Sequence, residues 1–214
     1  MAQYEELKQS VIMGQRDKVK EIVGALLERG NNPMDIISEG LTRGMLVVGQ
    51  KMETGDMFIP EVLASAQALG AGMELLKPII TGEELSTLSM GKVVIGTVQG
   101  DVHDIGKNIV SMILESAGFV VVNLGVNVPT DKFVEVVQRE RPEILGLSAL
   151  LTTTMPRMAD VVEALKRSHS RDKTQVIIGG AAVSQHFADS IGADGYAPDA
   201  ISALNKAKQL LGKL

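Results

Sequence analysis

Residues 93–108 read VVIGTVQGDVHDIGKN. A short β-branched apolar run comes first, a polar loop follows it, and a stretch of helical pattern comes next. This order of strand, loop and helix is typical of the first half of a βαβ unit. We therefore expect Asp101 and His103 to lie on the loop that joins a strand end to a helix start.

The rest of the C-terminal part repeats this alternation. Further apolar runs, each followed by a helical stretch, cover residues 120–122, 144–147 and 176–178. Strands that are apolar on both faces and alternate with helices predict an α/β fold with a doubly wound parallel sheet of the Rossmann-like (flavodoxin-like) type. Ligands of such sheets bind beyond the carboxyl ends of the strands, where the strand order reverses. The loop after Val98 is one of these places.

The first 80 residues carry helix signals instead. Asn32 followed by Pro33 predicts a capped helix start, and Pro60 predicts another. Apolar stripes at helical spacing cover residues 4–11, 19–27, 33–52 and 60–76. Four helices with short loops predict an antiparallel four-helix bundle. The predicted division is a four-helix domain at 1–80, a polar linker at 81–91 and an α/β domain at 92–214.

Composition narrows the chemistry. The chain has 21 Lys and Arg against 26 Asp and Glu, a net charge of −5, so it lacks the basic balance of nucleic-acid binders. It has no cysteine, which excludes disulfides, thiolate nucleophiles, iron–sulfur clusters and cysteine-bound zinc. Neither a leader peptide nor a membrane span is recognisable, and we expect a cytoplasmic protein with no nucleic-acid or membrane partner.

Asp101 and His103 are a candidate metal-ligand pair. A histidine on a loop can bind a metal through one ring nitrogen when a carboxylate fixes the other nitrogen. The alternative is that an aspartate only caps the next helix and that His103 is a surface residue. The D-x-H-x-x-G pattern by itself leaves both open. No dinucleotide, P-loop or H-E-x-x-H motif occurs, and His169 and His186 are expected to be structural.

Glycines recur in and just after the predicted strands, at Gly96, Gly146, Gly179 and Gly180. Glycine in a strand marks a close approach by backbone or ligand, so these positions, with the hydroxyl residues after the third strand, predict a narrow slot into the sheet. Ordinary packing of helices on the sheet is the alternative.

These motifs resemble the cobalamin-binding module of cobalamin-dependent methionine synthase and, more closely in size, the small corrinoid proteins of methanol and methylamine methyltransferase systems. The similarity extends over nearly the whole chain, and its most specific pieces lie at residues 97–108, 124–129, 146–152 and 178–181. The resemblance implies a bound cobalamin or related corrinoid in the base-off form. His103 would be the lower axial ligand of cobalt, Asp101 its hydrogen-bonding partner, and Thr154 the third member of the relay, where methionine synthase has serine.

The same resemblance assigns further cofactor contacts. The displaced nucleotide tail would meet Ser148, Thr152, Gly179, Gly180 and Ala200. The remaining contacts would come from Gly100, Val102, Asp104, Ile105, Gly106 and Leu150. The helical half resembles the cap over the upper face of the corrin, with contacts from Glu39, Met52 and Ile59, although plain bundle core is an alternative for Met52.

The function that this resemblance implies is a methyl carrier without catalysis of its own. Its partners would be a substrate-specific corrinoid methyltransferase, an acceptor methyltransferase for tetrahydrofolate or a thiol, and a reductive activation protein. Two alternatives are a cobalamin-dependent sensor and the small subunit of an adenosylcobalamin isomerase. The acidic chain disfavours a DNA-binding sensor, and residues 1–80 disfavour the isomerase subunit, which normally lacks this cap.

Overall fold

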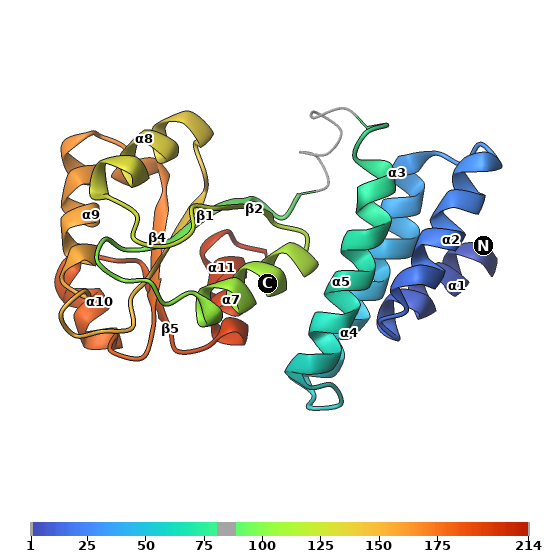
Figure 1. The fold of residues 1–214 in the computed structure, drawn as a ribbon, viewed down its shortest axis with the longest axis horizontal. Helices are drawn as coiled ribbons and strands as arrows, with labels where there is room; N and C mark the ends of the chain where they lie inside the picture. The colour runs from blue at the N-terminus through green and yellow to red at the C-terminus, as the bar shows by residue number, and fades with distance from the viewer. Residues whose placement is uncertain (1, 81–88, 214) are drawn as a thin grey trace. The chain divides into compact units, whose positions relative to one another are not determined.

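The structure is a computed structural model that describes residues 2–80 and 89–213 of the 214-residue chain. It divides into two compact units, whose main parts are residues 1–89 and 90–214 (Figure 1). Most of the predicted linker, residues 81–88, lies outside the described residues. No helix in the described ranges is long and apolar enough to cross a membrane.

The first unit is helical, as predicted. Its elements are α1 (Ala2–Ile12), α2 (Arg16–Glu28), α3 (Pro33–Asp35), η1 (Ile36–Thr42), α4 (Arg43–Glu53) and α5 (Ile59–Leu76). The Asn32 side chain accepts a hydrogen bond from the Met34 amide at 2.9 Å and caps the third helix, as its sequence predicts. At the start of α5 the Glu61 carboxylate accepts from the Phe58 amide at 2.9 Å.

The third helix is less regular than its apolar stripe suggests. The stripe predicts one helix over 33–52, whereas residues 36–42 form a π-helical stretch between α3 and α4. This region runs very close to α1: a Cβ at Gly44 would lie 2.8 Å from the Cβ of Val11. The π-helical stretch is only 7 residues long, and over so few residues the apolar spacing does not distinguish it from the α-helix on either side.

The second unit is the predicted doubly wound sheet. All of its strands are parallel, in the order β2-β1-β3-β4-β5. The strands are β1 (Lys92–Thr97), β2 (Val120–Asn123), β3 (Ile144–Ser148), β4 (Gln175–Gly179) and β5 (Gly195–Ala197). The helices are α7 (Ile105–Ser116), α8 (Thr130–Glu140), α9 (Arg157–Arg167), η2 (Arg171–Lys173), α10 (Gln185–Ile191) and α11 (Ala200–Leu210).

Helices cover both faces of this sheet, with α8, α9 and α10 on one face and α7 and α11 on the other (Figure 1). The first face packs a core that includes Val94, Phe133, Leu145, Met158 and Ile178. Alternate strand residues such as Val93 and Ile144 are also buried. Burial on both faces is why the strands are continuous apolar runs.

Two of the four strand glycines are explained by packing. A Cβ at Gly96 would lie 2.8 Å from the Phe133 ring, and one at Gly146 would lie 3.0 Å from the Ile95 side chain. The slot predicted at these two positions is therefore filled by side chains in this structure, which corrects the interpretation drawn from the sequence. The missing side chains make room for an aromatic ring of α8 and for the neighbouring strand.

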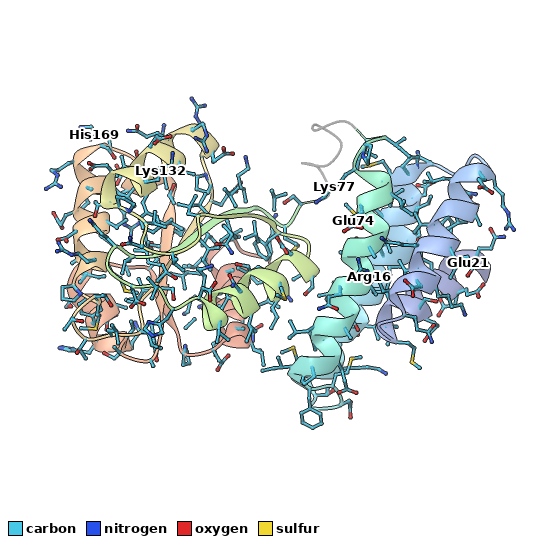
Figure 2. All side chains as sticks on the ribbon, in the orientation of Figure 1. Arg16, Glu21, Glu74, Lys77, Lys132 and His169 are labelled. Atoms are coloured by element: carbon cyan, nitrogen blue, oxygen red, sulfur yellow. The ribbon has the colours of Figure 1, made fainter. Side chains whose placement is uncertain are left out.

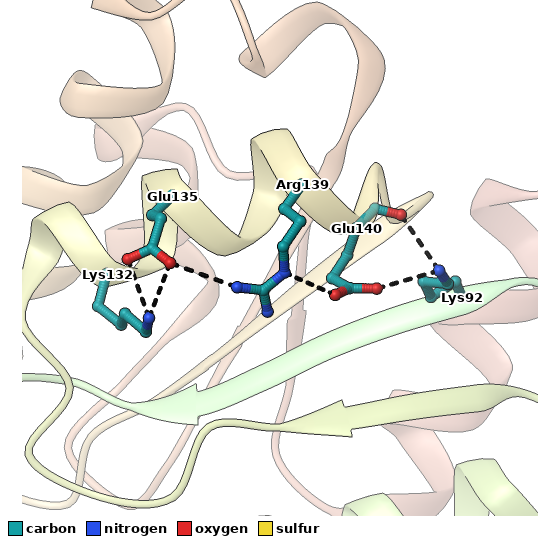
Figure 3. A network of polar contacts seen from close by, with 5 residues as sticks. All are labelled: Lys92, Lys132, Glu135, Arg139 and Glu140. Atoms are coloured by element: carbon teal, nitrogen blue, oxygen red, sulfur yellow. Dashed lines mark hydrogen bonds and ion pairs between the residues drawn. The ribbon is translucent and has the colours of Figure 1, made fainter.

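A charged network runs along the surface of α8 and reaches the amino end of β1 (Figure 3). Lys132 pairs with Glu135 at 2.8 Å, Arg139 pairs with Glu135 at 3.3 Å and with Glu140 at 2.9 Å, and Lys92 pairs with Glu140 at 3.2 Å. The network ties the first residue of β1 to the surface of α8.

Candidate functional site

The strand order reverses between β1 and β3, so the loops that follow these two strands leave the sheet in opposite directions. Backbone hydrogen bonds continue past the strands here, since the Val98 amide donates to the Ser148 carbonyl at 3.0 Å. The Asp101–His103 loop follows β1, and residues 149–156 follow β3. The two predicted site loops therefore meet at the reversal point.

The Asp101 carboxylate joins these loops. Its side chain is completely buried, and Oδ2 accepts from the Thr154 hydroxyl at 2.6 Å and from the Leu150 amide at 2.8 Å. Oδ1 accepts from the His103 amide at 3.1 Å and lies 2.7 Å from Nδ1 of the His103 ring. Burial alone would raise the pKa of Asp101, but the hydrogen bonds from Thr154, His103 and Leu150 outweigh it and hold the pKa well below its usual range.

This carboxylate sets the tautomer of His103. An ionised carboxylate only accepts hydrogen bonds, so the ring nitrogen facing it, Nδ1, carries the proton. Nε2 of the neutral ring then has the free lone pair, and it has no hydrogen-bond partner among the described residues. The side chain is 47% exposed. The structure thus presents one oriented imidazole nitrogen to a ligand.

Residues Thr97 and Asn127 hold the main chain of this loop, and sequence reasoning gave them no role. The Thr97 hydroxyl donates to the His103 carbonyl at 3.0 Å. The Asn127 side chain accepts from the Gly100 amide at 2.7 Å, and its own amide donates to the Asp101 carbonyl at 2.9 Å. A polar residue at the end of a buried strand and an asparagine in a tight turn are the only sequence signals for them.

Large apolar side chains are exposed around the imidazole. Val102 and Ile105, on either side of His103 in sequence, are 67% and 80% exposed. Leu150 and Leu151, whose amides face Asp101, are exposed as well, although the Leu151 hydrogen bond is long at 3.4 Å. Exposed apolar residues around one oriented nitrogen are typical of a surface that covers an apolar ligand.

The predicted tail contacts share this edge of the sheet. Ser148 ends β3, Gly179 ends β4, Ala200 begins α11 after β5, and Thr152 lies exposed in the turn after β3. A Cβ at Gly179 would lie 2.8 Å from the Ala197 carbonyl oxygen. A Cβ at Gly180, whose φ is +126°, would collide with the Ala149 carbonyl oxygen. These two glycines therefore allow close approach of the protein's own backbone.

Asp104 faces a different set of partners from Asp101. Its carboxylate accepts from the Asn108 side chain at 2.9 Å. The buried Lys107 donates to Asn108 at 2.6 Å and to Asn123 at 2.9 Å, and burial lowers the pKa of Lys107. This polar cluster fixes the start of α7 to the end of β2, while Gly106 has open space around it.

The predicted cap residues belong to the helical unit. Glu39 lies in the π-helical stretch and pairs with Arg43 at 3.0 Å. Met52 is half-buried in α4, and Ile59, the first residue of α5, is 39% exposed. Half-burial of Met52 is compatible with core packing and with a ligand contact. Their assignment as corrin contacts stays a prediction.

The other two histidines lie at the surface, His169 just after α9 (Figure 2) and His186 in α10. Within residues 2–80 and 89–213, no group of three or more metal-ligating side chains is arranged to hold an ion. A bare metal ion would need more donors than His103 and its neighbours supply. A metal that brings its own equatorial ligands would need only one nitrogen, and the site fits that kind of group.

Comparison with known protein families matches both units. A family model described as a B12 binding domain matches residues 91–205, and a second model with the same description matches residues 3–77. A corrinoid protein of Desulfitobacterium hafniense is 41% identical over 214 residues, covering 100% of this chain and 99% of the relative. Dimethylamine corrinoid protein 1 of Methanosarcina acetivorans is 47% identical over 195 residues, covering 90% and 91%.

A solved structure agrees over the full length. A chain in the crystal structure of a methanol:cobalamin methyltransferase complex from Methanosarcina barkeri matches with a TM-score of 0.88 and 34% identity. The match covers 100% of this chain and 81% of that chain.

Proposed function

The chain belongs to the B12-binding domain family, and from this premise we propose that it is a corrinoid-binding methyl carrier. It would take a methyl group from a substrate-specific corrinoid methyltransferase and deliver it to an acceptor methyltransferase, with tetrahydrofolate or a thiol coenzyme as the final acceptor. The observation that carries this proposal is the His103 imidazole, which Asp101 orients at 2.7 Å through one nitrogen while the other faces outward.

When bound, the corrinoid supplies a cobalt centre that can accept and release a methyl group. His103 would hold the cobalt of the corrinoid through Nε2, in place of the cofactor's own base. Asp101 accepts a hydrogen bond from Nδ1–H, which fixes the orientation of the ring and leaves Nε2 as the free nitrogen. Thr154 donates to the same carboxylate and completes the relay with a threonine hydroxyl.

The surrounding residues would bind the rest of the cofactor. Exposed apolar side chains such as Val102 and Ile105 would cover the flat macrocycle and exclude water. Ser148 and Thr152, at the end of β3 and in the turn after it, offer hydroxyls for the displaced nucleotide tail. Glu39, Met52 and Ile59 would shield the opposite face of the ring.

The partners would decide which methyl group is carried. Relatives named for dimethylamine and trimethylamine, and the likeness to a chain in a methanol:cobalamin methyltransferase complex, support methylated amines or alcohols as the donor class. A reductive activation protein is the third proposed partner, because a cobalt centre oxidised between cycles needs electrons from outside. The family match over residues 3–77 favours a carrier that has a helical cap, and it disfavours an isomerase subunit, which would have no cap.

Reconstitution tests this proposal. The purified chain, loaded anaerobically with hydroxocobalamin, should retain the cofactor on gel filtration. After a chemical reductant has brought the cobalt from Co(III) to Co(I), the loaded chain should be methylated only when a corrinoid methyltransferase and its methyl donor are added. Replacement of His103 by glycine should shift the absorption spectrum toward the water-ligated cofactor. Failure to retain cobalamin, or a spectrum that His103→Gly leaves unchanged, would refute the proposal.

A further inference from the structure

The loop that carries His103 has no regular secondary structure, yet hydrogen bonds hold its main chain at Gly100, Asp101 and His103. The Gly100 amide donates to the Asn127 side chain at 2.7 Å, and the Asp101 amide donates to the Val98 carbonyl at 3.1 Å. The Asp101 carbonyl accepts from the Asn127 amide at 2.9 Å, and the His103 carbonyl accepts from the Thr97 hydroxyl at 3.0 Å. Irregular loops normally leave such groups to water.

We propose that Thr97 and Asn127 are positioning residues for His103, which hold the loop so that the imidazole is already in place before a ligand binds. This inference rests on the proposed axial role of His103. It adds that, besides Asp101, which orients the ring and also accepts from the His103 amide, Thr97 and Asn127 fix the backbone from which the ring projects.

Thr97 is suited to this role by its position. It is the last residue of β1, and its side chain is completely buried. Both of its backbone groups bond to the chain after β2: its amide donates to the Gly125 carbonyl and its carbonyl accepts from the Val128 amide, at 3.0 Å each. The hydroxyl that reaches the His103 carbonyl is therefore attached to one of the most restrained backbone segments of the sheet. A ligand loop anchored there has little freedom to swing away.

Asn127 is suited to its role by its backbone conformation. Its φ of +52° lies in the left-handed region, which asparagine adopts more readily than most other residues. In this conformation its amide and its side-chain oxygen both face the 100–101 segment, so that one residue bonds to two successive residues of the ligand loop. Asn127 belongs to the chain after β2 and Thr97 to β1, so this clamp holds the ligand loop from two separate segments.

Matched variants test the clamp. Thr97→Val removes the hydroxyl, Thr97→Ser keeps it, and Asn127→Gly keeps the left-handed backbone and its amide but removes the side-chain oxygen. Thr174→Val is the control, because the Thr174 side chain is also buried and its hydroxyl donates to a backbone carbonyl, that of Pro142, at the same 3.0 Å, but at the amino end of β4. It removes the same type of hydrogen bond far along the sheet from the ligand loop.

Two readouts apply. In the cobalamin-loaded, one-electron-reduced protein, the nitrogen superhyperfine splitting in the EPR spectrum reports the fraction of cobalt with a histidine ligand. Thr97→Val and Asn127→Gly should each lower the ratio of ligated to unligated cobalt about fivefold, the net effect of one hydrogen bond. Thr97→Ser and Thr174→Val should keep the wild-type ratio. In the corrinoid-free protein, Asn127→Gly should speed hydrogen exchange at the Gly100 amide.

The outcomes separate the two proposals. Loss of the splitting in His103→Gly together with wild-type ratios in both Thr97→Val and Asn127→Gly would overturn the clamp and leave axial ligation intact. Persistence of the splitting in His103→Gly would overturn the axial role itself. If Thr97→Val does not fold, Asn127→Gly decides, because the exposed Asn127 side chain makes no core contact whose loss would unfold the sheet.

Discussion

The sheet unit carries two polar networks, one along the surface of α8 and one at the carboxyl end of β1, and burial distinguishes them. In the α8 network, Lys132, Glu135 and Arg139 keep about half of their side-chain surface in contact with solvent, between 47% and 56%. At the carboxyl end, Asp101 is completely buried and Thr154 nearly so. Only the His103 ring at the rim of this second network reaches solvent.

The comparison teaches why one network is a site and the other is a surface. Exposed charges are well solvated, so the free energy of unfolding changes little when one member of an exposed ion pair is removed. A buried carboxylate must have its hydrogen bonds satisfied, and it orients every group that satisfies them. Asp101 therefore fixes a ring and two loops, whereas Glu135 pairs with exposed side chains that water solvates equally well.

The largest expected difference is in stability. Asp101→Ala should lower the free energy of unfolding of the corrinoid-free protein by about 3 kcal/mol, because buried donors from Leu150, His103 and Thr154 lose their acceptor. Glu135→Ala, which also removes a carboxylate with two cationic partners, should leave unfolding within error of the wild type. Urea denaturation measures both, and equal losses would break the distinction between the networks.

Acid should separate the networks next. The pKa of Asp101 is lowered in the folded state, so its stabilisation is present above its unfolded pKa of about 4 and is lost as the pH falls below that value. The stability gap between the wild type and Asp101→Asn should therefore close on acidification. The pKa of Glu135 is also lowered, first by its hydrogen bond from Lys132, but this exposed pair should lose its effect in molar salt.

Urea denaturation across a pH series, with and without salt, provides the measurement for Asp101. A gap between the wild type and Asp101→Asn that stayed constant down to low pH would contradict the assignment of a carboxylate stabilised by hydrogen bonds. A gap that disappeared in salt at neutral pH would place Asp101 with the surface charges instead.

A smaller effect is expected at Thr154. Its hydroxyl has one proton, and the carboxylate at 2.6 Å is a stronger acceptor than the Leu151 carbonyl at 3.0 Å. Thr154→Val should lower the free energy of unfolding by about 1 kcal/mol, while Thr154→Ser, which keeps the hydroxyl, should lower it less. The same denaturation experiment checks this order, and equal costs for valine and serine would show that the hydroxyl contributes nothing.

The smallest effect should come from Lys92. Lys92→Met keeps the apolar stem and removes the pair with Glu140 at 3.2 Å. We expect no change in stability beyond error and no change in cobalamin retention, because Lys92 is the first residue of β1 and His103 follows its other end. Thermal unfolding and a retention assay provide the check. A loss of stability as large as that of Thr154→Val would show that the charged network along α8 supports the fold.

Much of this architecture follows from the sequence. The first four strands, the helix starts at Asn32 and Pro60 and the loop after β1 each carry a local signal, and the family resemblance was confirmed by both family matches. The fifth strand, Gly195–Ala197, was missed because three residues with a glycine show no periodicity. The domain boundaries at 80 and 92 stay predictions.

The site could be predicted from the sequence only where it is made of side chains whose residue type indicates their chemistry. Asp101 and His103 were identified from a motif and Thr154 from the family resemblance, and the structure brings the three into one hydrogen-bonded chain. The hydrogen bonds from the Leu150 amide to Asp101 and from the Gly100 amide to Asn127 were not predicted, because every residue type except proline has a backbone amide that can donate. The strand glycines were ambiguous for a related reason: the sequence shows that Gly96 has no side chain but not that the Phe133 ring fills the space.

The central claim is that Nε2 of His103 binds cobalt in place of the cofactor's own base. The most direct test is the EPR spectrum of the cobalamin-loaded, one-electron-reduced protein, prepared with histidine labelled with heavy nitrogen and with unlabelled cofactor. The superhyperfine triplet from an ordinary nitrogen should become a doublet, because the axial nitrogen then comes from the protein. A triplet that persists would show that the cofactor keeps its own base on the metal and would contradict the account.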